Sequence, residues 1–222
     1  MKLIFKNKFT EAGNAVSYVF KCPRGTMWQA GQYIRLELKD NDWADEHYFT
    51  IASAPYEKQI QVATRLTGSR FKNQLNGLQP GDAATAYGPE GDFVWQNTNT
   101  PKVMIALGIG ITPFHSILKQ RAHQGLSLAV TLLYFNRDDE IPFKAEIDRW
   151  QQEHPEFNAA YLNRRRISPA LIAKHLPQLG DSLIYISGPE PVVETVGSQL
   201  LNEYSIKQEQ LRRDYFPGYK EF

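Results

Sequence analysis

Two short segments of the chain combine glycine with the start of an expected helix, a pattern that suits a phosphate ligand. The first, GIGITP at residues 108–113, follows an apolar run and precedes a helical pattern. We expect Thr112 to cap this helix and Pro113 to be its first residue. The glycines would let a diphosphate approach the backbone at a helix N-terminus, which favours negative charge. A tight turn with a purely structural role has the same pattern, and proline replaces the third glycine of the G-x-G-x-x-G fingerprint.

The second segment, GSRFKNQL at residues 68–75, opens with Gly68 and Ser69 before a short helical pattern. Arg70 and Lys72 fall in the first turn of this helix. Cations there oppose the helix dipole by about 0.3 to 1 kcal/mol each, a penalty that a bound anion would reverse. The pattern indicates a second anion site, with a solvated basic turn as the alternative.

A third segment, HYFTIASAP, carries two adjacent aromatic side chains and the hydroxyl of Thr50, followed by residues of little bulk. An aromatic face and a hydroxyl presented together suit a flat ligand. The small residues Ala52 and Ser53 would leave backbone bare beside its edge.

The elements that would position these segments change in type along the chain. Up to about Trp95, short alternating or β-branched runs separated by Gly and Pro predict an antiparallel barrel or sandwich. The polar stretch QNTNTP, residues 96–101, is the expected linker. Beyond it, apolar strands alternate with helical patterns, which predicts a parallel sheet flanked by helices.

The composition narrows the classes of partner. The chain has 222 residues, with 25 Lys and Arg against 24 Asp and Glu, so no global field directs it to nucleic acid or an anionic membrane. A single cysteine, Cys22, excludes a disulfide framework, a cysteine-based zinc site and an iron–sulfur cluster held by this chain alone. We find no signal-peptide pattern and no apolar run that could span a bilayer, and expect a cytoplasmic protein.

Taken together, order and spacing of these segments resemble the ferredoxin–NADP reductase superfamily, which includes flavin reductases and the flavin domains of ferric reductases. HYFT resembles its R-x-Y-S/T motif, with His for Arg and Phe for Tyr, and GSRFKNQL resembles the helix that grips the flavin diphosphate. GITP resembles the pyridine-nucleotide loop, SGPEPVV resembles the C-G-P segment beside the nicotinamide, and DYFPGY resembles the aromatic C-terminus that covers the flavin.

The resemblance implies an N-terminal antiparallel β-barrel domain that binds FAD, residues 1–98. It implies a C-terminal α/β parallel-sheet domain with an aromatic tail that binds NAD(P)H, residues 99–222. The implied activity is a flavin-dependent NAD(P)H oxidoreductase in which hydride passes to FAD. Electrons then go to an acceptor that the sequence leaves open, such as a small ferredoxin-like or flavodoxin-like protein, a free flavin or a ferric chelate.

The resemblance also assigns residues. Thr50, Ser187, Glu190 and Tyr219 are the implied catalytic group, with the Thr50 hydroxyl near the flavin N5, Ser187 and Glu190 near the nicotinamide, and Tyr219 or Phe216 stacked on the flavin. Phe49 would lie against the isoalloxazine, His47 would face a flavin phosphate, and backbone of 51–53 would contact the ring edge. The implied cofactor-binding residues are His47, Tyr48, Phe49, Thr50, Ile51, Ala52, Ser53, Thr64, Arg65, Gly68, Ser69, Phe71, Lys72, Gly108, Gly110, Ile111, Thr112, Pro113, Arg137, Arg164, Gly188, Pro189, Phe216 and Tyr219.

The choice between NADPH and NADH depends on NRRRIS, where Arg164, Arg165 and Arg166 follow an apolar strand. Relatives that use NADPH place their phosphate-binding residues at this point, and guanidinium suits a phosphate. We expect that three consecutive side chains cannot all face one ligand, and that the acidic residues after Arg137 oppose a phosphate. The sequence favours NADPH.

Three departures from the family pattern support an alternative function. His47 stands for Arg, Lys72 stands where many relatives have Ser or Thr, and Ser187 replaces a frequent cysteine. A catalytically silent nucleotide-binding sensor, or an electron-transfer subunit of a larger complex, would tolerate these changes. The other histidines, which lack metal-ligand spacing, are interpreted as structural or solvated: His115, His123, His154 and His175.

Overall fold

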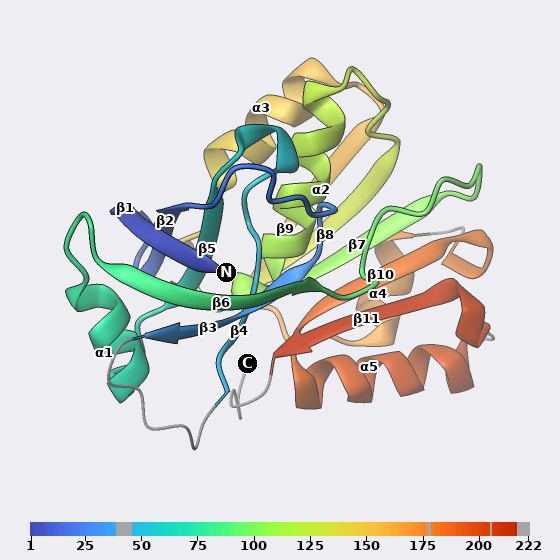
Figure 1. Cartoon of the computed structure of the whole chain (residues 1–222). Coiled ribbons are helices and arrows are strands. Elements are labelled where there is room, and N and C mark those ends of the chain that lie inside the picture. Colours follow the sequence, from blue (N-terminus) through green and yellow to red (C-terminus); the bar gives the residue numbers. More distant parts are fainter. Residues whose placement is uncertain (39–45, 177–178, 205, 217–222) are drawn as a thin grey trace.

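The protein is described by a computed structural model that covers residues 1–38, 46–176, 179–204 and 206–216. Its strands form two sheets, one antiparallel with six strands and one parallel with five. Figure 1 shows the two sheets beside each other, the first built from the N-terminal part of the chain and the second from the C-terminal part. The predicted fold class is confirmed.

The antiparallel sheet has the strand order β4-β3-β6-β1-β2-β5. Its strands are β1 (Lys2–Ala12), β2 (Ala15–Lys21), β3 (Tyr33–Leu38), β4 (Tyr48–Thr50), β5 (Ile60–Arg65) and β6 (Ala83–Glu90). Buried and half-buried residues alternate strictly along β3, as expected for a strand with one face on a core. The two edge strands meet where the Ala52 amide donates to the Gln61 carbonyl at 2.8 Å, so the sheet curls round one core.

The helix α1 (Arg70–Gly77) follows β5 and covers this core. Ser69 is its N-cap, and its side chain accepts a hydrogen bond from the Lys72 amide. Phe71 and Leu75, four residues apart, are its buried side chains, because residues at this spacing share one face of a helix. The helix predicted at this position is confirmed.

The parallel sheet has the order β11-β10-β7-β8-β9. Its strands are β7 (Lys102–Leu107), β8 (Val130–Asn136), β9 (Phe157–Asn163), β10 (Leu183–Pro189) and β11 (Leu211–Phe216). The α-helices of this half are α2 (Thr112–His123), α3 (Lys144–Glu153), α4 (Pro169–His175) and α5 (Glu190–Glu203). Short 3₁₀ turns are η1 (Pro55–Glu57), η2 (Gly108–Ile111), η3 (Leu179–Asp181) and η4 (Gln208–Gln210).

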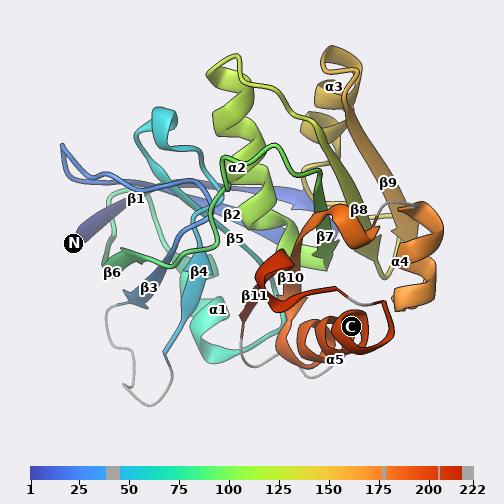
Figure 2. The same ribbon diagram turned by 90° about the vertical axis from the view of Figure 1, so that its right-hand side faces the viewer.

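Helices cover both faces of the parallel sheet. Figure 2 shows α2 and α3 on one face and α4 and α5 on the other. All six residues of β7 are buried, because a central strand covered on both faces has no solvent side. Each face has its own apolar core, one packed under α2 and α3 and one under α4 and α5.

The start of α2 differs from the sequence prediction by a short turn. The chain forms η2 before α2, and Thr112 is the first α-helical residue rather than the N-cap. Its hydroxyl donates to the Ile109 carbonyl at 3.2 Å instead of capping a free amide. Pro113 is consequently the second helical residue, a position where its missing N–H costs nothing.

Candidate functional site

A hollow of about 390 Å³ lies where the two sheets meet. The first sheet contributes the end of β4, including Thr50, and the second contributes the end of β11, including Asp214. The full lining consists of Tyr33, Tyr48, Phe49, Thr50, Gly91, Asp92, Phe93, Arg213, Asp214 and Tyr215. The fold thus joins strand ends that are far apart in the sequence into one concave surface.

Aromatic and hydroxyl side chains line the β4 side of the hollow. Tyr48 is 37% exposed, and its ring meets Tyr33 edge-on with centroids 5.7 Å apart. Phe49 lines the hollow, and its ring stacks on that of Phe71 with centroids 5.8 Å apart. Thr50, 8% exposed, ends the strand. These are the residue types that a flat aromatic ligand would contact.

On the opposite side, Ser187 and Asp214 form a polar pair, of which the sequence indicated Ser187 but not Asp214. Parallel pairing of β10 with β11 sets the two residues side by side, and the Ser187 hydroxyl donates to the Asp214 carboxylate at 2.8 Å. Burial raises the pKa of Asp214 to about 6, against the lowering effect of the Ser187 hydrogen bond. Asp214 is therefore a carboxyl group that changes charge close to neutral pH.

Negative charge also affects Tyr33 in the same hollow. Burial, with the nearby Glu90, Asp214 and Asp92 carboxylates, raises the pKa of the Tyr33 phenol. Arg213 lines the hollow as well, but its Nε packs against Gly197 of α5 and lies 4.0 Å from the Glu194 carboxylate.

Two glycines bring the carboxyl ends of β7 and β10 unusually close. A Cβ on Gly110 would lie 2.3 Å from the Ser187 carbonyl oxygen, and a Cβ on Gly188 would lie 2.5 Å from Leu107 Cβ. Both glycines are needed for packing between protein segments. Packing between protein segments is thus sufficient reason for a glycine at position 110, and the approach of a ligand to this loop stays a prediction.

The backbone after β4 is also not bare, contrary to the sequence expectation for Ile51, Ala52 and Ser53. All three residues have no exposed surface. The Ile51 amide donates to the Gln32 carbonyl at 2.9 Å, and the Ala52 amide donates to Gln61 at 2.8 Å. The carbonyls of Ala52 and Ser53 bind side chains of α2. These residues position the hollow rather than line it.

The predicted diphosphate site lies around α1, next to β4. Gly68 has the left-handed φ of 76° just before the N-cap Ser69, and both are exposed. The His47 ring stacks on Phe71 with centroids 3.7 Å apart, which brings the HYFT segment against this helix. Arg65 is half-buried and donates to the Asn14 side chain at 3.0 Å, whereas Thr64 is buried. Lys72, half-buried, lies in the first turn.

A second, larger hollow of about 920 Å³ lies at the carboxyl ends of β8 and β9. Its basic residues are Arg137, Arg164, Arg165 and Arg166, so all three consecutive arginines line it. Arg164 donates to the Asp139 carboxylate at 2.7 Å from an exposed position. The acidic residue thus orients one arginine and offsets part of the local positive charge.

Asn136, at the end of β8, was not singled out from the sequence. It is 1% exposed and lines the arginine hollow. Neither polar atom of its side chain has a hydrogen-bond partner among the described residues. Because buried amides are nearly always paired, a ligand in this hollow would satisfy it.

Comparisons with known proteins agree with this architecture. The family model described as "Oxidoreductase NAD-binding domain" matches residues 104–197. A flavohemoprotein from Vibrio cholerae is 24% identical over 89% of this chain and 55% of its own. Ferredoxin–NADP reductase B from Sorangium cellulosum is 26% identical over 77% of this chain and 74% of its own. The chain spans about half the length, or less, of the flavohemoproteins that it matches.

A solved structure shares the fold over nearly the whole chain. The flavohem-like FAD/NAD binding domain of nitric oxide dioxygenase from V. cholerae superposes with a TM-score of 0.83, at 21% identity, over 97% of this chain and 98% of that domain. In sequence and in fold the chain resembles the ferredoxin–NADP reductase superfamily. The resemblance on which the sequence analysis relied is confirmed.

Some residues that the superfamily resemblance implied lie apart from the two hollows. Glu190 is the first residue of α5, is half-buried and lines neither hollow. Gly108, Ile111, Thr112, Pro113, Gly188 and Pro189 are buried at the strand ends behind them. Phe216 ends β11, with its backbone paired to Pro189, and its side chain lies outside the described residues, as does the whole of Tyr219.

Within residues 1–38, 46–176, 179–204 and 206–216, no helix is both long and apolar enough to cross a membrane. Over the same ranges, His, Cys, Asp and Glu form no group of three that could hold a metal ion.

Proposed function

We propose that this protein is an NAD(P)H-dependent flavin reductase, with residues 1–98 binding FAD and residues 99–222 binding the nicotinamide nucleotide. The observation that carries this proposal is the hollow lined by Thr50 of one sheet and by Asp214, the hydrogen-bond partner of Ser187, of the other. When bound there, FAD would accept hydride from the nicotinamide and release electrons one or two at a time.

The described residues fit an isoalloxazine ring and its diphosphate. Tyr48 and Phe49 offer aromatic surface, and Thr50 offers a hydroxyl, at one wall of the hollow. The exposed turn at Gly68 and Ser69 lies before α1, whose face contacts His47 and thereby the same segment. An aromatic ligand with a phosphate tail would follow this path from the hollow to the helix start.

The protein's own residues bind, orient and exclude water. Thr50 presents a hydroxyl to the reactive edge of the flavin. Ser187 holds the Asp214 carboxylate in place through its 2.8 Å hydrogen bond. The ionised carboxylate is placed to stabilise the positive charge that a nicotinamide ring gains as it gives up hydride, and such fixed charges act strongly where water is excluded.

The arginine hollow is proposed to hold the adenosine end of the nucleotide. Ligands of α/β sheets bind outside the carboxyl ends of the strands, which is where Asn136 and the arginines lie. Four guanidinium groups at one hollow favour NADPH over NADH, because its additional phosphate can accept their hydrogen bonds.

Replacing Arg164 by Ala is expected to raise the KM for NADPH about tenfold and leave that for NADH within about twofold, because one charge-assisted hydrogen bond to the phosphate is lost. Steady-state kinetics with both nucleotides measure this ratio. Arg149→Ala is the matched control, since Arg149 is exposed on α3 outside the hollow. Equal increases for the two nucleotides would contradict a phosphate-reading role.

Replacing Thr50 by Val keeps the shape of the side chain and removes its hydroxyl. We expect flavin content to stay unchanged and flavin reduction to slow about tenfold, the effect of one lost hydrogen bond in the transition state. Stopped-flow absorbance under anaerobic conditions measures the rate. The exposed Thr67→Val is the control, and an unchanged rate in Thr50→Val would remove Thr50 from the catalytic group.

An anaerobic titration tests the proposed function as a whole. The purified protein, reconstituted with FAD, should bleach in the visible range as NADPH or NADH is added. The faster donor then identifies the nucleotide. Protein that takes up no FAD, or whose flavin is untouched by both nucleotides, would favour a catalytically silent nucleotide-binding module. The acceptor of the electrons, whether a small redox protein, a free flavin or a ferric chelate, is assayed by adding each in turn to the reduced protein.

A further inference from the structure

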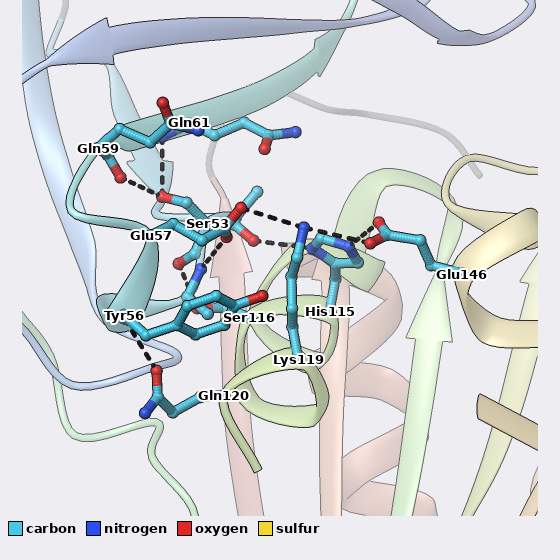
Figure 3. A network of polar contacts seen from close by, with 12 residues as sticks. Ser53, Tyr56, Glu57, Gln59, Gln61, His115, Ser116, Lys119, Gln120 and Glu146 are labelled. Atoms are coloured by element: carbon cyan, nitrogen blue, oxygen red, sulfur yellow. Dashed lines mark hydrogen bonds and ion pairs between the residues drawn. The ribbon is translucent and has the colours of Figure 1, made fainter. Parts of the chain in front are cut away.

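A network of polar side chains joins the two sheets outside both hollows. It connects the segment after β4 and the turn η1 with α2 and α3, as Figure 3 shows. At its centre lies His115, in the first turns of α2, which is only 1% exposed. A buried histidine at the junction of two halves of a protein differs from the structural or solvated role that the sequence suggested, because its partners come from both halves.

Both ring nitrogens of His115 face acceptors. Nδ1 lies 2.8 Å from the Ala52 carbonyl oxygen, and Nε2 lies 2.6 Å from Oε2 of Glu146 on α3. A carbonyl oxygen cannot donate, so Nδ1 carries a hydrogen that it donates to Ala52. Nε2 faces the Glu146 carboxylate, whose oxygens accept hydrogen bonds when ionised.

Charged side chains of both signs surround His115 and Glu146. Burial raises the pKa of the Glu146 carboxyl, but the hydrogen bond and charge of His115, together with Lys119, outweigh it and lower the pKa to about 2. Lys119 lies 3.2 Å from Glu146 and 3.2 Å from Glu57 of η1. Glu11 also faces the group from β1, and burial raises its pKa.

Further contacts follow the same face of α2. Ser116 donates to the Ser53 carbonyl at 2.7 Å, one residue along from the Ala52 contact. At the far end of the helix, the Tyr56 ring stacks on His123 with centroids 3.7 Å apart. Consecutive carbonyls of one segment are thus held by consecutive side chains of one helix. This register allows little sliding between the two halves.

The position of these contacts relates them to the chemistry of the site. Ala52 is two residues beyond Thr50, which lines the central hollow, and His115 is three residues beyond Thr112, where α2 leaves the glycine turn. The His115–Ala52 hydrogen bond therefore links a segment that adjoins the proposed flavin side to the helix that adjoins the proposed nucleotide side. Displacements of about 1 Å in such alignments can cost about a hundredfold in rate.

We propose that His115 is a positioning residue for hydride transfer, which sets the distance between the flavin-binding strand and the nucleotide-binding helix by holding the Ala52 carbonyl. This rests on the proposed function. Its partner Glu146 orients the ring from the opposite side. The rings of Phe143 and Trp150, with centroids 4.1 Å and 5.6 Å from the imidazole, keep water from the pair.

The test compares three replacements that separate the two hydrogen bonds of the ring. The amide nitrogen of Asn can occupy the place of Nδ1 and donate to Ala52, whereas that of Gln occupies the place of Nε2 and reaches only Glu146. Leu makes neither bond. In all three variants Glu146 keeps Lys119 as its partner, so no carboxylate is left unpaired.

We expect His115→Leu and His115→Gln to slow flavin reduction at saturating nucleotide about ten- to a hundredfold, with the dissociation constant of the nucleotide changed less than about threefold. His115→Asn should recover most of the rate. Stopped-flow traces also give the long-wavelength charge-transfer absorbance of the nicotinamide–flavin pair, which should weaken in Leu and Gln and return in Asn. His175→Leu, an exposed site on α4, is the control.

Each outcome decides the proposal. If the wild-type flavin is not reduced by either nucleotide, the proposed function fails and the positioning role fails with it. If the wild-type flavin is reduced but Leu is equally fast, or if Asn and Gln are equally slow, only the positioning role is overturned. If the Leu variant does not fold, the Asn and Gln variants are compared at equal flavin content. Faster flavin reduction in the Asn variant supports the proposal, and equal rates overturn it.

Discussion

Replacing Asp214 by Asn is expected to slow flavin reduction about a hundredfold at pH 8, the typical effect of removing one fixed charge or donor aimed at a developing charge. The wild-type rate should rise with pH through about 6, the pKa to which burial raises this carboxyl group, as the carboxylate forms. The Asn variant, which stays neutral, should have a low rate without this pH dependence. Stopped-flow reduction between pH 5 and about 8.5 measures both profiles.

The same substitution should make the protein more stable. The native pKa of Asp214 lies above its ordinary value of 3.8, so the native state binds more protons than the unfolded state between 3.8 and about 6. Stability of the wild type therefore falls as pH rises through this window. At pH 8 a shift of this size lowers the free energy of unfolding of the wild type by about 3 kcal/mol, and the Asn variant should regain this amount. Below about pH 3.5 the shift has no effect on the free energy of unfolding.

Urea denaturation at pH 8 and at pH 4.5 checks the stability half of this prediction. Asp181→Asn, an exposed residue of η3, is the matched control and should change neither quantity. A variant that is slower and also less stable would indicate that Asp214 holds the fold. A variant that is more stable than the wild type and reduces flavin equally fast would show that Asp214 has no role in catalysis.

Replacing Gly110 by Ala is expected to destabilise the protein by about 1 to 3 kcal/mol or more, the cost of overpacking, and to abolish most reduction by NAD(P)H. The new Cβ would lie 2.3 Å from the Ser187 carbonyl oxygen and 2.9 Å from Gly188 Cα, and neither backbone atom can rotate away. Relief requires the end of β10 to move, and Ser187 carries the hydrogen bond that holds Asp214. One methyl group thus disturbs both packing and the proposed site.

Gly77→Ala is the control for this substitution. Gly77 ends α1 in the structure, and a Cβ there meets nothing within 4 Å. The change should stabilise the protein by up to about 1 kcal/mol through a less flexible unfolded chain. Urea midpoints and reduction rates of the two variants give the comparison, and a Gly110→Ala protein as stable and active as the wild type would contradict the packing argument.

Several elements could be predicted because their causes are local. The helix α1 begins after Ser69, and Phe71 and Leu75 face the core, since capping and four-residue spacing act within a few residues. The alternation of apolar strands and helices after residue 101 predicts a parallel sheet for the same reason. The sequence prediction placed the start of α2 one residue too late, after Thr112 as N-cap, because it did not foresee the 3₁₀ turn from Gly108 that precedes the helix.

The missed site residues depend on contacts between distant segments. Asp214 gains its raised pKa only because the C-terminal segment forms β11 against β10, which brings it to Ser187, 27 residues away. The bonded pair His115 and Ala52 is 63 residues apart. Asn136 is one polar residue at the end of an apolar strand, and only the hollow beside it makes it a candidate for ligand binding.

The sequence alone determined the two kinds of sheet and their order along the chain, because periodicity, glycine and proline act through the local backbone. Tertiary structure decided which groups remain free to bind a ligand. The backbone of residues 51–53 and the space beside Gly110 serve the protein's own packing, and the Asp214 carboxyl group lies where burial changes its protonation. Desolvation and close packing are properties of the assembled interior, so no spacing of residues along the chain reveals them.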